Sequence, residues 1–297
     1  ELREAGLSPE QTPWSSVGLR LASEPPPNVQ ALEAFKAGRI EIQDEGSQIV
    51  CWLAGVTPGM TVVDYCAGGG GKTLGLAAQM TPETTKVAEV AEAPAKVWTP
   101  TGEAEPAPVR KATLTANEGR LVAYDVVQKR LDNIKPRLQR AGVAAELHQL
   151  GPNGGGVEDM VGQADVVLVD APCTGSGTWR RRPEDAWRLK PEDVDRMHTL
   201  QKAIVARAAK LVKPGGRLVY VTCSMLTAEN EATMDAFEED HPGFAPVAIA
   251  DALASPNFTD AGRNRLAELA KGGHRLRLSP ATSNTDGFFA AVYERQA

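Results

Sequence analysis

The sequence predicts an α/β fold with a doubly wound, mostly parallel sheet and an antiparallel edge strand. Short β-branched runs alternate with segments of helical periodicity, which is the pattern of parallel α/β sheets. One run, 165–170, is apolar almost throughout, as in a strand buried on both faces. Residues 287–295 read as a strand with no helix after them, which suits an antiparallel edge. With 297 residues, 42% of them hydrophobic, the chain can bury a core without disulfides or metals.

Alternation and periodicity place each element in order. We expect strands at 61–65, 120–125, 145–150, 165–170, 217–223 and 287–295, and helices at 43–56, 72–80, 126–141 and 194–212. A further short strand is expected within 35–42, after a turn. Pro136 lies inside one predicted helix and should kink it or end it early, because proline removes a helical hydrogen bond.

Composition divides the chain into three parts. Residues 1–42 are mixed and contain three consecutive prolines, whereas 43–297 carry the α/β pattern. Residues 81–119 interrupt that pattern with five prolines among Ala, Glu and Thr. Such aperiodic, proline-rich segments bury little apolar surface, so we expect a flexible insertion without activity of its own.

The charge is acidic overall but uneven. The formal net charge is −6, which argues against a general polyanion binder. Residues 180–217 nevertheless hold eleven basic and five acidic side chains, and 224–260 hold eight acids and no Lys or Arg. The four cysteines form no CxxC pair, so neither a structural zinc site nor a disulfide framework is expected. No apolar run approaches the ~18 residues of a membrane helix. We expect a cytoplasmic protein with no membrane partner and no metal.

The glycine loop at 66–71 follows a predicted strand and opens a helix. Glycines let a ligand approach the backbone closely, and a helix N-terminus favours negative charge. A phosphate-binding Walker loop needs Gly six places before Lys72, where Cys66 stands, and the GxGxxG dinucleotide pattern fits no register. An NTPase is therefore disfavoured, and a purely structural turn remains the alternative.

The segments that follow four of the predicted strands should converge on one edge of the sheet. Ligands of such sheets bind beyond the carboxyl ends of the strands, which meet at that edge. Asp125 ends the second strand, where an acid commonly bonds a ribose hydroxyl. The insertion places it unusually far from the glycine loop; Glu89 and Glu92 are nearer, but no helical pattern follows them.

Two of the cysteines follow buried strands at this same edge. Cys173 lies in Asp-Ala-Pro-Cys after 165–170, and Cys223 lies in Thr-Cys-Ser after the next strand. An activated thiol is the strongest side-chain nucleophile near neutral pH, so this pair indicates chemistry. Cys51 lies on a helical stripe and is expected to be a small buried hydrophobe, as is Cys66.

These segments carry a resemblance to a known family. They read GRIEIQDEGSQ (38–48), VVDYCAGGGGKT (62–73), VAYDVVQKRLDNIKPRLQRAG (122–142), VLVDAPCTGSGTWRRRPEDAW (167–187), LQKAIVARAAKLVKPGGRLVYVTCS (200–224), AENE (228–231) and TDGFFAA (285–291). In this order they resemble the bacterial RsmB (Fmu) and Nop/Sun family of RNA cytosine-5 methyltransferases. The resemblance covers most of 28–297 apart from the insertion.

The resemblance implies a seven-stranded class I methyltransferase sheet in a catalytic domain at 43–297, with S-adenosylmethionine as cofactor. Residues 1–42 would be the remnant of a small N-terminal RNA-contacting module and its linker. It further implies that Cys223 is the nucleophile, that Cys173 is the base releasing the product, and that Asp170 bonds the target cytosine. The implied cofactor-binding residues are Cys66, Ala67, Gly68, Gly69, Gly70, Gly71, Lys72, Asp125, Arg130 and Asp170. The partner would be RNA, by preference ribosomal RNA, bound by a monomer.

Positive charge is needed for contact with RNA. Arg180, Arg181 and Arg182 directly follow the loop of Cys173, and Arg suits phosphate contacts. A solvated run of charges is the alternative explanation. Trp179 and Trp187 could stack on bases or pack in the core.

The chain departs from the family pattern at two places. The family loop reads CAAPGGKT, and here Gly68 and Gly69 replace Ala and Pro. Leu150 and Gly151 stand where the family has an Asp at the adenine. Two other functions stay open: a DNA cytosine-5 methyltransferase, in which Cys173 would attack, and a non-catalytic RNA-binding scaffold for ribosome assembly. The second cysteine and the basic stretch favour the RNA enzyme.

Overall fold

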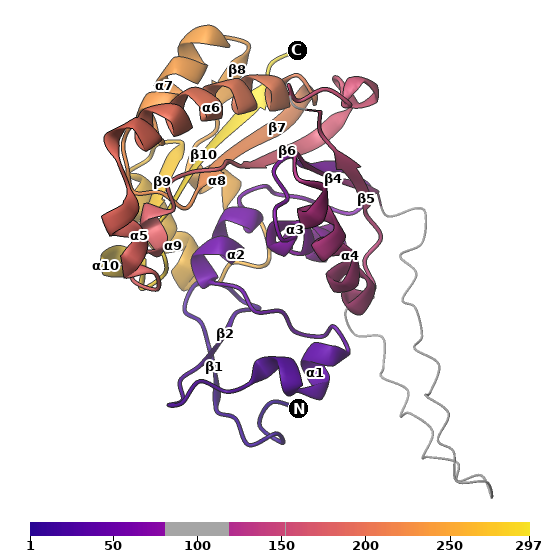
Figure 1. Ribbon diagram of the computed structural model, residues 1–297, viewed down its shortest axis with the longest axis vertical. Coiled ribbons are helices and arrows are strands. Elements are labelled where there is room, and N and C mark those ends of the chain that lie inside the picture. Colours follow the sequence, from indigo (N-terminus) through magenta and orange to yellow (C-terminus); the bar gives the residue numbers. More distant parts are fainter. Residues whose placement is uncertain (81–118, 152) are drawn as a thin grey trace, which may run out of the picture.

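The predicted α/β sheet is present in the computed structural model, which describes residues 1–80, 119–151 and 153–297 (Figure 1). Five parallel strands lie in the order β5, β4, β3, β6, β7, and β10 then pairs antiparallel with β7. Two short antiparallel strands, β8 and β9, pair along the other side of β10. The strand bounds are β3 Thr61–Asp64, β4 Arg120–Asp125, β5 Glu146–Gln149, β6 Ala164–Asp170, β7 Val212–Thr222, β8 Phe244–Pro246, β9 Arg275–Leu278 and β10 Phe288–Arg295. The mostly parallel sheet with an antiparallel edge is thus confirmed, but among the described residues it has eight strands and not seven, because β8 and β9 extend the sheet beyond β10.

Side chains of the central strands alternate between two cores, which is why these strands read as apolar throughout. In β6, Val166 and Leu168 join one core, whereas Val167 and Val169 join the other. The first core packs beneath α2 (Glu45–Trp52), α3 (Gly71–Met80), α8 (Ile249–Ala252) and α9 (Asp260–Ala270), and α4 (Gln128–Ala141) covers the same face. The second packs beneath α6 (Pro191–Ala209) and α7 (Glu231–Asp240), which lie together above the sheet in Figure 1.

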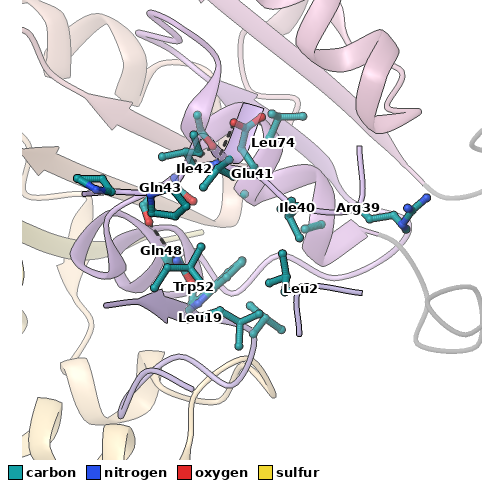
Figure 2. Close-up of a pocket in the computed structure, with 18 residues that line it drawn as sticks. Leu2, Leu19, Arg39, Ile40, Glu41, Ile42, Gln43, Gln48, Trp52 and Leu74 are labelled. Carbon is teal, nitrogen blue, oxygen red and sulfur yellow. Dashed lines mark hydrogen bonds between the residues drawn. The ribbon is translucent and has the colours of Figure 1, made fainter. Parts of the chain in front are cut away.

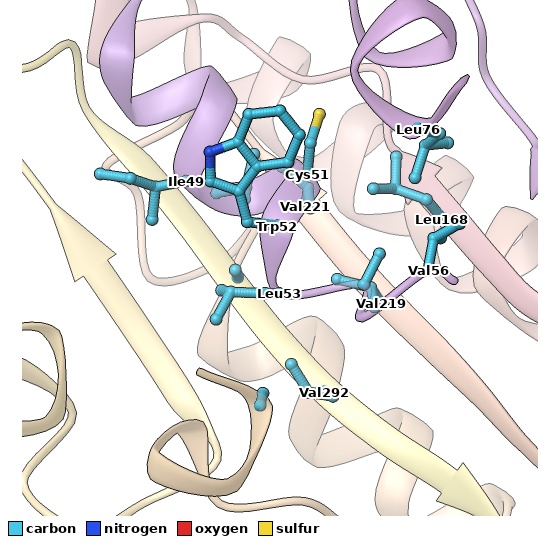
Figure 3. Close-up of a cluster of buried hydrophobic side chains, with 14 of the residues drawn as sticks. Ile49, Cys51, Trp52, Leu53, Val56, Leu76, Leu168, Val219, Val221 and Val292 are labelled. Carbon is cyan, nitrogen blue, oxygen red and sulfur yellow. The ribbon is translucent and has the colours of Figure 1, made fainter. Parts of the chain in front are cut away.

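Cys51 is buried in the first core, as expected for a cysteine on a helical stripe. Figure 3 shows it among Trp52, Val221 and Leu76, on the α2 side of the sheet. Burial raises the pKa of its thiol to about 12, so it stays protonated at neutral pH. Cys51 therefore acts as a packing residue.

The helix at 126–141 runs past its proline. α4 extends from Gln128 to Ala141 with Pro136 inside it, so the expected early end is wrong. Leu131, Ile134 and Leu138 are buried on one face of the helix, and Pro136 lies on the exposed side. The missing hydrogen bond therefore falls where water can solvate the freed carbonyl, and the buried stripe holds the helix together.

The N-terminal segment is a small attachment to the α/β domain. It contains a two-stranded hairpin, β1 (Pro9–Gln11) and β2 (Leu19–Leu21), and a short helix, α1 (Glu33–Lys36). The Glu45 carboxylate accepts hydrogen bonds from the backbone N–H groups of Trp14 (2.9 Å) and Ser15 (3.1 Å). That 1–42 contacts RNA stays a prediction.

The strand expected within 35–42 does not form. Residues 33–36 are helical, and 37–42 have no regular structure. Side chains tie this stretch to α4: the Arg140 guanidinium lies 3.8 Å from the Phe35 ring centroid, and Glu41 pairs with Arg140. A strand needs a neighbouring strand edge to bond its backbone, and this segment lies against a helix instead.

The insertion expected at 81–119 lies outside the described residues except for Gly119, and so do Glu89 and Glu92. Within the described part of the chain, no helix is both long and apolar enough to cross a bilayer.

Candidate active site

The glycine loop joins the end of β3 to the start of α3, as the sequence predicts. Gly68 and Gly70 have φ values of +54° and +81°, in the left-handed region that favours glycine. A Cβ on Gly70 would lie 2.9 Å from the Ile134 side chain, so this turn requires glycine. A Cβ on Gly69 would lie 3.5 Å from Arg137 Nη1, and the same nitrogen donates a hydrogen bond to the Gly69 carbonyl, so the Arg137 side chain lies against this part of the loop.

Asp125 lies beside this loop, at the end of β4. Its carboxylate accepts hydrogen bonds from the N–H of Gly68 (2.9 Å) and the N–H of Val127 (2.8 Å). Arg130 Nη1 is 3.7 Å from the same carboxylate. The expected cofactor-binding residues Gly68, Asp125 and Arg130 are therefore brought together. The carboxylate also holds the loop in place, a second role that the sequence does not indicate.

Lys72 and Asp170 form an ion pair between the start of α3 and the end of β6. Lys72 Nζ is 2.7 Å from Asp170 Oδ2, and the side chains are 10% and 31% exposed. Burial is the largest single effect and lowers the pKa of Lys72, but attraction to Asp170, the hydrogen bond with Asp170 and the nearby cysteines together leave that pKa raised. The other Asp170 oxygen, Oδ1, has no hydrogen-bond partner among the described residues. Asp170 thus keeps an acceptor for a ligand while Lys72 fixes its position.

Cys173 and Cys223 meet although they are 50 residues apart in the sequence. Their Sγ atoms are 3.4 Å apart, within hydrogen-bonding distance for sulfur. The hydrogen bond from Cys173 lowers the pKa of Cys223 against the effect of burial. The same bond and burial raise the pKa of Cys173. The pair is therefore asymmetric: Cys223 forms the thiolate more readily, and Cys173 keeps the proton.

Ala67 and Cys66, at the start of the glycine loop, differ in burial. Ala67 is buried, and its N–H bonds the Tyr124 carbonyl of β4 at 2.9 Å. Cys66 opens the loop and is partly exposed; burial, followed by the nearby Asp170 and Asp64 carboxylates, raises the pKa of its thiol. Cys66 is therefore no candidate nucleophile.

The three arginines after Cys173 differ in their surroundings. Arg180 Nε and Arg181 Nε each donate to the fully buried Asp286 carboxylate at 2.8 Å. Arg182 is exposed and has no side-chain partner in the described part of the chain. Contact of these arginines with RNA stays a prediction, but Arg180 and Arg181 already have an internal role.

Trp179 and Trp187 also differ in their exposure to solvent. The Trp179 indole N–H is buried, whereas the Trp187 side chain, on α5 (Pro183–Arg188), is 91% exposed. The sequence left both core packing and base stacking open for each of them, with core packing at least as strong an expectation. Trp187 is therefore the more accessible of the two rings, whereas Trp179 is partly buried.

Sequence reasoning missed three polar residues with no exposed surface: Gln201, Glu229 and Asn230. Their side chains bond the segments on either side of the two cysteines. The signal was available, because Glu229 and Asn230 lie six and seven residues after Cys223. Both residues lie in the AENE segment (228–231) that carries the family resemblance, but residue type and spacing alone assign them no role.

A cavity of about 570 Å³ lies between the N-terminal segment and the helices α2 and α3 (Figure 2). The N-terminal segment lines it with Leu2 and Leu19, and the helices line it with Trp52 and Leu74. Gly71 is at its border, but neither Asp125, Asp170 nor either cysteine of the pair lines it. The cavity is therefore distinct from the edge where the predicted site residues converge.

This chain is similar to known proteins. The model of the family described as 16S rRNA methyltransferase RsmB/F matches residues 108–294. A Bacillus subtilis protein named "Probable ribosomal RNA small subunit methyltransferase B" is 31% identical over 86% of this chain and 47% of its own length. Ribosomal RNA small subunit methyltransferase B of Pseudomonas syringae is 29% identical over 98% of this chain and 54% of its own.

Among solved structures, a methyltransferase homolog protein from Pyrococcus horikoshii superimposes with a TM-score of 0.68 at 25% identity, covering 99% of this chain and 80% of its own. The chain spans about half the length of the curated relatives quoted above. The family match covers the region of both cysteines and of Asp125 and Asp170. The chain therefore belongs to the RsmB/F family of 16S rRNA methyltransferases.

Proposed function

We propose that this protein methylates C5 of a cytosine in small-subunit ribosomal RNA, with S-adenosylmethionine as methyl donor and through a covalent adduct of Cys223. The observation that supports this most strongly is the Cys173–Cys223 pair, with its sulfur atoms 3.4 Å apart at the ligand-side edge of the sheet. A single thiol would suffice for many reactions. Two thiols with opposite shifts in pKa suit a reaction that needs both a nucleophile and a base.

The residues present fit the proposed donor. The loop presents backbone without side chains from Gly68 to Gly71, with Arg137 bonded to the Gly69 carbonyl, and Gly70 allows the tight turn that brings the loop to the sheet edge. We assign the methionine end to the loop from Cys66 to Lys72, and the ribose to Asp125 with Arg130 beside it. When bound, S-adenosylmethionine supplies an electrophilic methyl group.

The chemistry of cytosine explains why two thiols are required. C5 is a poor nucleophile in the aromatic ring. When the Cys223 thiolate bonds to C6, the ring becomes an enamine-like species whose C5 can accept a methyl group. The C5 proton must then be removed so that the C6–sulfur bond can break, which restores the ring and the Cys223 thiolate.

Cys173 is the base in this scheme. It holds the proton of the resting pair, so it must first release that proton, to the ring nitrogen or to water, once Cys223 is bonded to C6. The resulting thiolate takes the C5 proton. Asp170, held by Lys72, has Oδ1 available to bond the polar edge of the cytosine.

The alternatives make different demands. A DNA-type enzyme would attack with Cys173 and has no use for a second thiol, whereas here Cys223 lies 3.4 Å from Cys173. A non-catalytic scaffold has no need of an asymmetric thiol pair. The substitution of the adenine-side Asp by Leu150 and Gly151 is the feature that favours a scaffold.

The test is methylation of transcribed small-subunit rRNA with labelled S-adenosylmethionine, followed by mass spectrometry of the digested nucleosides. We expect 5-methylcytidine with the wild-type protein and none with Cys223→Ala. Calorimetry of donor binding separates the alternatives: a protein that binds no donor is a scaffold, and label in DNA but not in RNA indicates the DNA enzyme.

A further inference from the structure

Two consecutive buried polar residues lie between the strand of Cys223 and helix α7. Glu229 and Asn230 have no exposed surface, although they follow a loop at the ligand-side edge of the sheet. Buried polar groups are costly unless they are hydrogen-bonded, so their partners indicate what they are for.

Asn230 holds the segment of Cys223 from both sides. Its side-chain oxygen accepts a hydrogen bond from Thr222 Oγ1 at 2.6 Å, and its side-chain nitrogen donates to the Ser224 carbonyl at 2.9 Å. Residues 222 and 224 are the direct neighbours of Cys223. The single Asn side chain therefore fixes the backbone on which Cys223 is carried.

Glu229 holds the segment of Cys173. Its carboxylate accepts from the Thr174 N–H at 2.8 Å and from Thr174 Oγ1 at 2.6 Å, and Thr174 follows Cys173 directly. Gln201 Nε2, from α6, donates to the same carboxylate at 3.1 Å and to the Pro172 carbonyl at 2.9 Å. Both neighbours of Cys173 are thus tied to Glu229, one of them through Gln201.

The same carboxylate joins the two segments directly. Ser224 Oγ, next to Cys223, also donates to Glu229 Oε2. The two oxygens thus accept four hydrogen bonds, from both cysteine-bearing segments and from α6. Bonds to a carboxylate are about twice as strong as those between neutral groups. This set of contacts leaves little freedom for either segment to move relative to the other.

We propose that Glu229 and Asn230 are positioning residues that hold Cys173 and Cys223 at the mutual distance and orientation needed for proton sharing. This inference rests on the proposed function for its meaning, because that function gives the two thiols their separate roles. Glu229 also contributes electrostatically: after the hydrogen bond to Cys223 and burial, its charge further raises the pKa of Cys173. It thereby helps to reserve the thiolate for Cys223.

Glu229→Gln separates geometry from charge. In the Gln variant, the amide oxygen can still accept from the Thr174 N–H and from Gln201. The amide nitrogen faces two hydroxyl groups, Thr174 Oγ1 and Ser224 Oγ, and hydroxyls can accept as well as donate. Glu229→Ala removes all four bonds. Glu45→Ala is the matched control, because Glu45 is also a buried carboxylate bonded to backbone N–H groups, but it binds the N-terminal segment.

The first readout needs no RNA. The rate of iodoacetamide alkylation of Cys223 is followed against pH by mass spectrometry of the digested protein. In Glu229→Ala, we expect the alkylation profile to move to higher pH, because Cys173 no longer lies where it can stabilise the Cys223 thiolate. Glu229→Gln should move it much less, and Glu45→Ala should match the wild type. Melting curves show which variants are folded.

The second readout is single-turnover methyl transfer to RNA. Misplacement of reacting groups by about 1 Å can cost ~100-fold in rate, so we expect Glu229→Ala to lose about that factor with RNA affinity unchanged. Glu229→Gln should recover most of the loss. If Glu229→Ala does not fold, Thr174→Val takes its place, since it removes one bond to the carboxylate and keeps the side-chain shape.

The outcomes separate this inference from the proposed function. A folded Glu229→Ala protein with a wild-type alkylation profile would overturn the positioning role, whatever the enzyme methylates. A shifted profile in Glu229→Ala, together with a wild-type protein that methylates no cytosine, would refute the proposed function and leave the positioning role standing. An equal shift in Glu45→Ala would show a general effect of lost stability and would also overturn the inference.

Discussion

Replacing Cys173 by Ala should turn the proposed enzyme into one that traps its substrate. Cys223 remains and can still bond to C6 of the cytosine. Without Cys173 there is no base to remove the C5 proton, so the C6–sulfur bond cannot break after methyl transfer. We therefore expect a protein–RNA adduct that survives denaturing electrophoresis, and no turnover.

The adduct should also form more slowly than in the wild type at neutral pH. The Sγ atoms of the pair are 3.4 Å apart, and Cys173 donates the hydrogen bond that lowers the pKa of Cys223. A hydrogen bond to a charged group is worth about 1.5–3 kcal/mol, and the low end applies here because a thiol is a weak donor. Its loss reduces the thiolate fraction of Cys223 by about 10-fold where the thiol form predominates. Raising the pH should restore the rate of adduct formation.

The assay is a time course of the gel-shifted adduct at several pH values, for Cys173→Ala and Cys223→Ala, with melting curves for both. Cys223→Ala should give neither product nor adduct at any pH. If the adduct appears with Cys223→Ala instead, Cys173 is the nucleophile and our division of roles is wrong. An adduct from Cys173→Ala whose rate does not depend on pH would refute the argument from the sulfur–sulfur hydrogen bond.

The other predictions concern the donor site, the insertion, the RNA contacts and the core. Asp125→Ala should weaken donor binding by ~10-fold or more, since it removes a hydrogen-bond acceptor for the ribose and frees the glycine loop; unchanged affinity by calorimetry would place the ribose elsewhere. Replacing 84–116 by a short Gly/Ser linker should leave the melting temperature and donor affinity nearly unchanged, and a large loss of either would show that the segment packs on the core or contacts the donor. Trp187→Ala should weaken RNA binding by about 1–3 kcal/mol if this exposed ring stacks on a base, and Arg182→Ala should make RNA binding less sensitive to salt; filter binding at several salt concentrations measures both, and wild-type values would remove α5 from the RNA contact. Burial raises the pKa of Asp64 to about 7, so the folded state still holds a proton that the unfolded state releases near pH 4. As the pH rises between these two values, the free energy of unfolding should fall by up to ~1.4 kcal/mol per pH unit. In denaturant titrations at several pH values, Asp64→Asn should reduce this decline. The same dependence on pH in the variant as in the wild type would contradict the assignment to Asp64.

Local patterns were sufficient to predict the sheet and the ligand-side edge. The run at 165–170 has no polar face, and only a strand covered by helices on both sides suits such a run. Once the parallel strands are placed, their carboxyl ends must share one edge, so Asp125, Asp170 and the two cysteines had to lie near one another. Gly70 was likewise readable as a tight turn.

The elements between 224 and 283 were not predictable in the same way. β8, α8 and β9 have only three or four residues each, and α7 and α9 bury only a few side chains each, so local periodicity is weak in all of them. The course of α4 past Pro136 also depended on the context, because the cost of a proline depends on whether water reaches the freed carbonyl.

Side-chain pairing across the fold was decided by tertiary structure alone. The sequence shows that Arg180 and Arg181 are basic, but their partner Asp286 is more than 100 residues away. Residue types and spacing can assign Cys173 and Cys223 to the same edge of the sheet. They cannot say which thiol donates the proton, because that depends on burial and on hydrogen bonds from distant segments. The chemical groups of the site are thus readable from the chain, whereas their protonation and orientation arise only when the strands and α6 bring those segments together.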